Sequence, residues 1–349
     1  MNDCIARPLL LIAVAALAVD ARATEPKQVR PSTGTIWELR AASAHVATTI
    51  GDSLDKGHDW LYRRLEHWIE NTDTRYGSSD AEHIVVPLSP LRVGYNVEIV
   101  HGNGGFGLLG TPDLEATVRL PNIERRLRLF ITSSDIQESP TDPARAPNPV
   151  RLGVRVSPHT AIDFELGVRL KVWPVVFAAW KWAPTFHGKS LTAYPFAKAY
   201  VESGMGIGVS SGITLERWRG RWVTRSASYA DWVRNTTNTS WTQSLLAGYA
   251  PAIIQERRYG TVAAGHDLAC GAAVKLSASG DRLSRVQWYE GSVLIKRPLH
   301  GGWLFGYVEP LLHWDRAHDW HPDLGVRIGF DALFWGLAKR PAEVASLCR

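Results

Sequence analysis

Residues 91–99 read Leu-Arg-Val-Gly-Tyr-Asn-Val-Glu-Ile, and this stretch decides the fold class. Its odd-numbered positions, from Leu91 to Ile99, are all apolar or aromatic, whereas Arg92, Asn96 and Glu98 stand between them beside a glycine. Successive side chains of a β-strand point to opposite faces of the sheet. A period of two over this length therefore predicts a strand with one apolar and one polar face.

The same alternation recurs to the end of the chain, most clearly in residues 114–120, 150–156, 164–172 and 324–331. The polar face of these segments carries full charges, and the apolar face carries bulky aliphatic side chains. A transmembrane β-barrel requires this pattern, because its outer surface meets lipid while its interior is polar. We therefore predict an all-β membrane protein, folded as a closed antiparallel up-and-down β-barrel.

Turn residues divide the chain into about fourteen strands, with twelve or sixteen as alternatives; bacterial single-chain barrels have even numbers. The expected strands are 91–100, 114–120, 126–133, 150–157, 163–172, 175–183, 191–202, 206–218, 221–233, 240–249, 259–268, 286–297, 303–314 and 323–333. Pro195 interrupts one of them, where the lost ladder hydrogen bond predicts a local irregularity.

The connections are expected to alternate between short periplasmic turns and longer external loops. Residues 121–125, 219–220 and 299–302 fall on the short side by this parity. The long side comprises residues 101–113, 134–149, 234–239, 269–285 and 315–322. The link at Trp173-Pro174 is short where this scheme expects a long loop.

Residues 1–23 predict a secretory signal peptide. Arg7 precedes a short apolar run, and Ala21-Arg22-Ala23 fits a cleavage site. Beyond residue 23 no apolar run reaches the length of a helical membrane span, so the sequence excludes such spans. Cys4 would leave with the signal. Cys270 and Cys348 are interpreted as free or structural thiols, although an oxidising periplasm permits a disulfide between them.

Residues 24–80 change to a helical period, with an apolar stripe that runs from Ile36 to Trp68. One interpretation is a helix packed on the periplasmic rim of the barrel or inside its mouth. The other is a gate, or a docking helix for a periplasmic partner. We assign the transmembrane barrel to residues 85–335 and a short periplasmic tail to residues 336–349.

The polar faces of the strands would line the interior of the barrel. The predicted interior charges are Glu98, Glu115, Arg119, Arg126, Arg128, Arg151, Arg155, Glu165, Arg169, Lys171, Arg327 and Asp331. In a water-filled channel such residues tune solute selectivity, whereas in a narrow barrel they form paired networks with a structural role. The excess of arginine over acidic residues between positions 119 and 171 favours anionic solutes.

Eight tryptophans lie near the ends of expected strands. Amphipathic indole rings favour the membrane–water interface, which predicts an aromatic girdle. The girdle would comprise Trp173, Trp182, Trp218, Trp222, Trp232, Trp241, Trp303 and Trp314.

Motifs for chemistry are weak. Outer-membrane phospholipases carry a His-x-Ser-Asn-Gly pattern, and the nearest match, residues 101–105, reads His-Gly-Asn-Gly-Gly without the serine. We interpret it as an external loop. Residues 313–321 include three histidines and two aspartates that could hold a metal, but a polar external loop explains them equally. Residues 204–208 read as a hairpin turn. We expect no catalytic residue, no cofactor and no metal. We also expect no nucleic-acid partner, because the basic residues form no clustered face.

The segments 122–130 and 302–310, with a last strand whose alternation ends on Phe330, resemble strands of uncharacterised proteobacterial outer-membrane β-barrels. The resemblance covers residues 85–335. It implies location in the cell outer membrane, contact with outer-membrane lipid and recognition by the barrel assembly machinery.

The first functional interpretation is a channel or passive transporter for small, weakly anion-favoured solutes. The second is a non-conducting structural or interaction barrel, plugged by charge networks and the N-terminal helix. The third, a lipid-modifying enzyme, is disfavoured by the missing His-x-Ser pattern.

Overall fold

The computed structural model describes most of residues 91–334 and scattered helical residues between Ser53 and Asn71. The gaps within the first range are 103–104, 120–126, 133–149, 160, 171–172, 235–238, 258–264 and 283–284. The predicted signal peptide, most of the predicted helical segment and the predicted tail lie outside the described residues. In the part of the chain that the structure describes, no helix is long and apolar enough to cross a membrane.

Fifteen strands form one antiparallel sheet. They are β1 (Leu91–Gly102), β2 (Gly105–Arg119), β3 (Leu127–Thr132), β4 (Val150–His159), β5 (Ile162–Leu170), β6 (Val175–Trp182), β7 (Phe186–His187), β8 (Leu191–Glu202), β9 (Gly206–Arg219), β10 (Trp222–Val233), β11 (Thr239–Arg257), β12 (Gly265–Arg282), β13 (Arg285–His300), β14 (Leu304–Asp315) and β15 (Pro322–Phe334). A short 3-10 helix, η1 (Arg316–His318), links β14 to β15.

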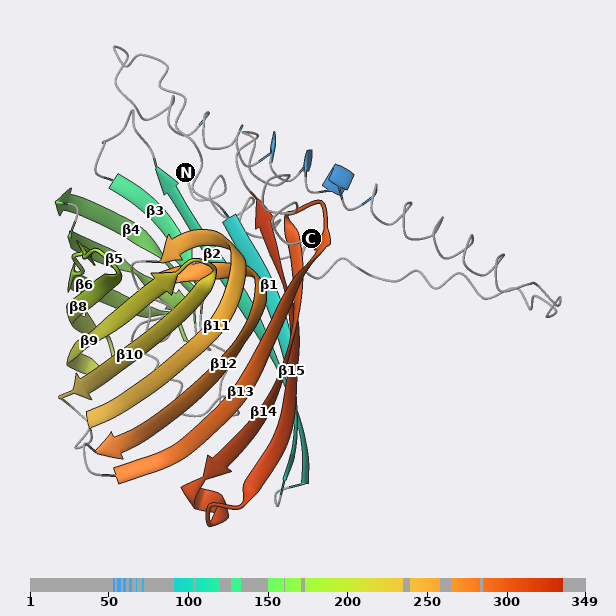
Figure 1. Cartoon of the computed structure of the whole chain (residues 1–349). Coiled ribbons are helices and arrows are strands. Elements are labelled where there is room, and N and C mark those ends of the chain that lie inside the picture. The colour runs from blue at the N-terminus through green and yellow to red at the C-terminus, as the bar shows by residue number, and fades with distance from the viewer. Residues whose placement is uncertain are drawn as a thin grey trace, which may run out of the picture. The chain divides into compact units, whose positions relative to one another are not determined.

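The sheet closes on itself (Figure 1). Each strand pairs with its neighbours in sequence, β1 pairs with β15, and β6 pairs with β8 past the two-residue β7. The ring therefore contains fourteen strands within the described part of the chain, in agreement with the predicted closed, antiparallel, up-and-down barrel. Leu91 lies opposite Phe334, so the first strand starts and the last strand ends at the same rim, which we call the terminal rim; the other is the far rim.

The two faces of the ring differ as the sequence alternation predicts. Outward side chains are bulky and exposed, as in Leu166 (60%) and Leu276 (55%). Inward side chains are polar and buried, as in Glu165 (3%) and Lys198 (1%). A soluble protein shows the reverse arrangement. A closed ring satisfies its backbone groups internally and presents apolar side chains outward, which suits a barrel that crosses lipid.

The predicted boundaries fail in three regions. Residues 105–113 and 269–282, expected in external loops, belong to β2 and β12, and residues 250–257, expected between two strands, belong to β11. In residues 105–113 glycine stands on both faces and Leu108 and Leu109 are consecutive, and in residues 269–282 Gly and Ala stand on both faces, so neither segment alternates clearly between large apolar and polar side chains. His101 and Gly102 likewise lie in β1 rather than in a loop.

The lengths of the connections do not separate the two rims as predicted. At the far rim, residues 103–104 and 283–284 join strands tightly, and only 133–149 is long; at the terminal rim, 183–190 exceeds most far-rim connections. The expected irregularity falls at Pro195: its register with β9 is continuous, but on the other edge of β8 the ladder with β6 ends at Ala197 and pairing resumes with β7 at Ala193.

Two further expectations can be compared with the structure. The predicted turn at residues 204–208 is confirmed: β8 and β9 are joined there, and Gly204 and Gly206 have φ of 91° and 86°, a conformation that glycine adopts without strain. Cys270, in β12, is disulfide-bonded, which corrects the expectation of a free thiol. Cys4 and Cys348 lie outside the described residues.

Candidate functional site

The inward charges are distributed unevenly around the ring. One group, which we call the basic arc, lies on β3–β6 and β8. Its described members are Arg128, Arg151, Arg155, Asp163, Glu165, Arg169, Lys181, Lys198 and Glu202. Six of these are cations and three are carboxylates, so this side of the interior carries a net positive charge.

Three cation pairs of the basic arc lie directly opposite each other on neighbouring strands. Arg128 of β3 faces Arg155 of β4, and Arg151 of β4 faces Arg169 of β5. Lys181 of β6 faces Lys198 of β8. Like charges at directly opposed positions destabilise a sheet. The arrangement therefore needs anionic groups within the interior, and part of that need is met by the arc's own carboxylates.

Glu202 is the carboxylate that Arg151 and Arg169 share. Its Oε2 atom lies 3.1 Å from Nη2 of Arg169 and 3.9 Å from Nη2 of Arg151, and all three side chains are buried. Glu202 ends β8 at the far rim, and Arg151 and Arg169 stand next to the far-rim ends of β4 and β5. Near the far rim, the basic arc therefore consists of two cations that share one carboxylate.

Glu165 has the same role nearer the terminal rim. Its Oε1 atom accepts hydrogen bonds from Nε of Arg155 and Nζ of Lys181, both at 2.8 Å. Arg128 lies beside Arg155 in the ladder and is the second residue of β3. The basic arc therefore extends from one rim almost to the other.

Two glycines and two aromatic rings lie side by side on the inner face of β3–β6, in the middle of the basic arc. Gly153 lies opposite Gly167, and the flanking rung positions hold Phe130 and Phe177. A Cβ on Gly167 would stand 3.0 Å from Cε1 of Phe177 and 2.2 Å from a backbone oxygen, so only glycine fits beneath these rings.

Each of these two rings carries an arginine of the basic arc. The Arg151 guanidinium carbon lies 4.5 Å from the centroid of Phe177, and that of Arg155 lies 5.1 Å from the centroid of Phe130. Cation–π attraction of this kind helps to hold each guanidinium group beside the face of its aromatic ring.

A second group, the acidic arc, lies on β13–β15, β1 and β2. Its described members are Arg92, Glu98, Asp113, Glu290, Lys296, Glu309, Asp315, Asp323, Arg327 and Asp331. Carboxylates outnumber cations here by seven to three. The acidic arc ends at β2 and the basic arc begins at β3, so the two arcs are adjacent around the ring, and β9–β12 separate their other ends.

Arg327 is the centre of the acidic arc. Its guanidinium donates to Oε2 of Glu98 at 2.7 and 2.9 Å and to Oε2 of Glu309 at 2.8 Å, and it lies 3.6 Å from Glu290. Arg327 faces Glu98 on one side and Glu309 on the other, so opposite charges stand in register here, as Arg155 and Glu165 do in the basic arc. Arg327 therefore pairs with carboxylates of both neighbouring strands.

Asp331 forms a second paired group on the same wall. Arg92 donates two hydrogen bonds to its Oδ1 atom at 2.8 and 3.0 Å, and Lys296 forms an ion pair with its Oδ2 atom. Arg92 also lies 3.5 Å from Asp113.

The predicted interior charges can now be located. Glu98, Arg128, Arg151, Arg155, Glu165, Arg169, Arg327 and Asp331 all lie on the inward face. Glu115 and Arg119 belong to β2, opposite Arg92 and Arg128, but their side chains are outside the described part. Arg126 and Lys171 lie outside the described residues.

Several interior charges were missed by the sequence interpretation. They include Lys181, Lys198, Glu202, Glu216, Arg225, Asp231, Glu290, Lys296 and Glu309. Each stands on an expected strand, and the signal that could have found it is a charge in phase with the other polar positions of that strand. Glu216 and Arg225 face each other across β9 and β10 and are 2.6 Å apart.

The predicted aromatic girdle is partly different from the observed arrangement. Trp173, Trp182, Trp222 and Trp232 are exposed near strand ends, and Trp241 and Trp314 stand at outward positions in phase with exposed neighbours. Trp218, in contrast, points inward and donates to Glu216 at 2.7 Å. Trp303 is buried at the terminal rim. The indole N–H of Trp218 donates to an interior carboxylate, and that of Trp303 donates to Asp55. Each ring therefore has a hydrogen-bond partner that does not require the membrane–water interface.

The acidic and histidine residues between β14 and β15 do not gather. His318 pairs with Asp323 at 2.9 Å, and His313 lies 3.8 Å from Asp315. Within the described residues, no group of three or more metal-ligand side chains is close enough to hold an ion.

No family model matches the sequence. No curated protein matches it either.

The chain is similar, at low TM-scores, to several solved structures that include an outer membrane protein and a porin. The outer membrane protein OprD from Pseudomonas aeruginosa is 11% identical; the match covers 75% of this chain and 98% of that chain, with a TM-score of 0.39. OccK11 (OpdR), also from Pseudomonas aeruginosa, is 11% identical over 71% of this chain and 95% of that one, with a TM-score of 0.37. The KdgM porin is 8% identical over 69% and 98%, with a TM-score of 0.34.

These matches are to Gram-negative outer-membrane porins, the class of barrel that the sequence resembles. The closed ring and its apolar exterior agree with the predicted outer-membrane location. With TM-scores below 0.5 and identities of 11% or less, the likeness assigns neither a family nor a substrate to the chain.

Proposed function

We propose that this protein is an outer-membrane channel that passes small anionic solutes along its basic arc. The observation that carries the proposal is the set of directly opposed cations, Arg128 with Arg155, Arg151 with Arg169 and Lys181 with Lys198. Among its described side chains the basic arc has six cations and three carboxylates, and this net positive charge would attract a passing anion.

The size of the ring supports the same function. Small eight-stranded barrels are filled by their own side chains, whereas barrels of sixteen to eighteen strands leave an aqueous channel. A ring of fourteen strands is closer to the second class. The basic arc extends from one rim almost to the other, and among the described residues of the adjacent acidic arc carboxylates outnumber cations. An anion would therefore be drawn to the basic arc and kept away from the acidic arc.

A second candidate is a non-conducting structural barrel, and one observation favours it. Phe196 of β8 and Tyr229 of β10 point inward and stack with ring centroids 5.9 Å apart, and both are buried. Aromatic side chains packed in this way narrow the open space inside a barrel.

Single-channel recording of the mature chain, residues 24–349, in planar bilayers separates the two candidates. We expect steady conductance and an anion-selective reversal potential in a salt gradient. The variant Arg128→Gln/Arg155→Gln should lose selectivity toward a permeability ratio of one. Arg297→Gln, an exposed outward cation of β13, is the matched control and should change nothing.

The same recording without residues 24–80 tests the predicted N-terminal segment. Conductance only after this truncation would make the segment a plug. Silence of both forms would reject the channel and favour the structural barrel, and cation selectivity of the unmodified chain would reject the anion preference.

A further inference from the structure

The interior wall of the barrel is not polar everywhere. On β9–β13, mostly in the half nearer the terminal rim, several inward positions carry apolar side chains that pack together. This group, which we call the interior apolar patch, consists of Trp218, Val223, Leu246, Ala250, Leu268, Ala273 and Leu294. Apolar surface on a water-filled wall is costly to expose, so an apolar segment that covers this patch would be stabilising.

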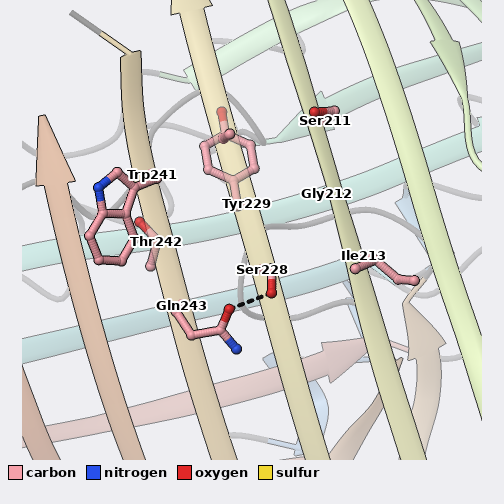
Figure 2. A pocket seen from close by; sticks show the side chains of 9 residues that line it. Ser211, Gly212, Ile213, Ser228, Tyr229, Trp241, Thr242 and Gln243 are labelled. Atoms are coloured by element: carbon pink, nitrogen blue, oxygen red, sulfur yellow. Dashed lines mark hydrogen bonds between the residues drawn. The ribbon is translucent and has the colours of Figure 1, made fainter. Parts of the chain in front are cut away.

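The outer face of the same strands offers a less uniform surface. Polar side chains stand there among the apolar ones, as Figure 2 shows for Ser228 and Gln243, which are joined by a hydrogen bond. A segment that covers apolar side chains would therefore find a more continuous surface on the inner side of these strands.

A disulfide connects β12 to another segment of the chain at this patch. Cys270 lies in β12 between Leu268 and Ala273, has only 1% of its surface exposed and is disulfide-bonded. The sequence contains two other cysteines, Cys4 and Cys348. Cys4 belongs to the predicted signal peptide. Once that peptide is removed, Cys348 is the partner that remains in the chain.

The C-terminal segment, residues 335–349, is long enough to bring Cys348 to Cys270. β15 ends at Phe334 at the terminal rim, and fourteen residues lead from there to Cys348. An extended chain of that length spans up to about 46–50 Å. β12 lies three places from β15 in the ring, and Cys270 is its sixth residue from the terminal rim. Strand spacing and rise per residue then place Cys270 on the order of 20–25 Å from the end of β15.

The end of the C-terminal segment has a composition that suits an apolar surface. Residues 341–348 read Pro-Ala-Glu-Val-Ala-Ser-Leu-Cys, with one charged residue among eight. The Cα atoms of two disulfide-bonded cysteines usually lie about 4.4–6.8 Å apart. A bond to Cys270 would therefore hold the residues next to Cys348 beside Leu268 and Ala273.

We propose that the C-terminal segment packs on the interior apolar patch and is fixed there by a disulfide between Cys270 and Cys348. Val344 and Leu347 would supply apolar side chains for this contact. The barrel would then carry a covalently attached segment of its own chain inside its terminal-rim end. The proposal does not depend on whether the barrel conducts.

Peptide mapping tests the bond. The full chain is expressed, and the protein is purified from outer membranes without reductant, with free thiols blocked by N-ethylmaleimide. Trypsin cuts after Arg258, Lys275 and Lys339 but not before a proline. We therefore expect one disulfide-linked pair of peptides, residues 259–275 with residues 340–349, which reduction separates. N-ethylmaleimide on Cys348, a bond between Cys4 and Cys270, or a covalent dimer on a non-reducing gel would overturn the proposal.

Matched variants test where the segment packs. Leu246 belongs to the interior apolar patch, whereas its neighbour Leu245 points outward and is 50% exposed. The measurement is the equilibrium between reduced and disulfide-bonded protein in glutathione buffers, because a packed segment raises the effective concentration of one thiol at the other. Leu246→Ala should shift this equilibrium about tenfold toward the reduced form, since it removes buried apolar groups from the contact. Leu245→Ala should leave it unchanged.

A third variant changes the segment and leaves every strand intact. Leu347→Ser should shift the same equilibrium toward the reduced form, and heat-modifiable gel mobility shows whether each variant has formed the barrel. A weaker disulfide in Leu245→Ala than in Leu246→Ala would place the segment on the outer face and overturn the proposal. An equilibrium unchanged by Leu347→Ser would overturn it as well.

Discussion

Arg151 of β4 and Arg169 of β5 lie directly opposite each other in the ladder, and both reach a carboxylate of β8. The relation is unusual because like charges at opposed positions repel, and here both guanidinium groups are buried. The sheet tolerates the pair because Glu202 stands beside it and because Arg151 lies against the face of Phe177. This balance makes the basic arc sensitive to single substitutions.

Glu202→Gln should destabilise the barrel, because the two buried arginines lose the carboxylate they share. Removal of one member of a buried ionic group typically costs about 3–5 kcal/mol. Urea unfolding of detergent-solubilised protein, followed by tryptophan fluorescence, measures the change. Asp319→Asn, an exposed residue after η1, is the control and should have no effect. A Glu202→Gln variant as stable as the control would contradict the assigned role.

Arg327→Met should also destabilise the protein, since it leaves Glu98, Glu290 and Glu309 close together without their shared cation. The expected loss is again about 3–5 kcal/mol. Adding Glu98→Gln to this variant removes one of the stranded carboxylates. The double variant should therefore lose less stability than the sum of the two single variants, and strict additivity in the double-mutant cycle would exclude the proposed coupling.

Gly167→Ala tests the packing of the glycines and aromatic rings in the middle of the basic arc. The added methyl group would meet a backbone oxygen and the ring of Phe177, and overpacking of this kind costs about 1–3 kcal/mol. Because Phe177 carries Arg151, the selectivity of any conductance should shift as well. Gly107→Ala of β2 is the matched control, as its nearest neighbour would be 3.9 Å away. Both variants can be compared by urea unfolding and reversal potential.

Trp303→Phe tests the contact between the helical residues and the turn that joins β13 to β14. The indole N–H of Trp303 donates to Oδ1 of Asp55 at 2.9 Å, and Nε2 of His300 lies 3.0 Å from Oδ2 of the same residue. Loss of the donor should speed tryptic cleavage at Lys56, Arg63 or Arg64. Trp320→Phe, in the connection between β14 and β15, should leave the cleavage rate unchanged. Equal rates in the two variants would mean that this hydrogen bond does not hold the helical residues.

The sequence alone predicts the barrel, an approximate number of strands and the inward or outward direction of side chains in its clearly alternating strands. Alternation is a property of one strand, so it is readable wherever one face is large and apolar and the other is charged, as in β1 and β5. It fails in β12, where small residues between Gly271 and Gly280 occupy both faces.

The site is less accessible to such reasoning. The excess of arginine between residues 119 and 171 was visible, but the opposed pairs depend on the register between strands. Nothing in the alternation of β4 states that Arg151 will face Arg169 rather than Gly167.

The pairing of β1 with β15 has a consequence for synthesis of the protein. These are the first and last strands of the ring, and eleven successive residues of β1, from Leu91 to His101, have a partner in β15. A growing chain therefore cannot close its ring until its final strand has been made. Until then two strand edges remain open, with unpaired backbone groups that lipid cannot satisfy. Chains interrupted before residue 322 would lack β15 and would keep both of those edges open.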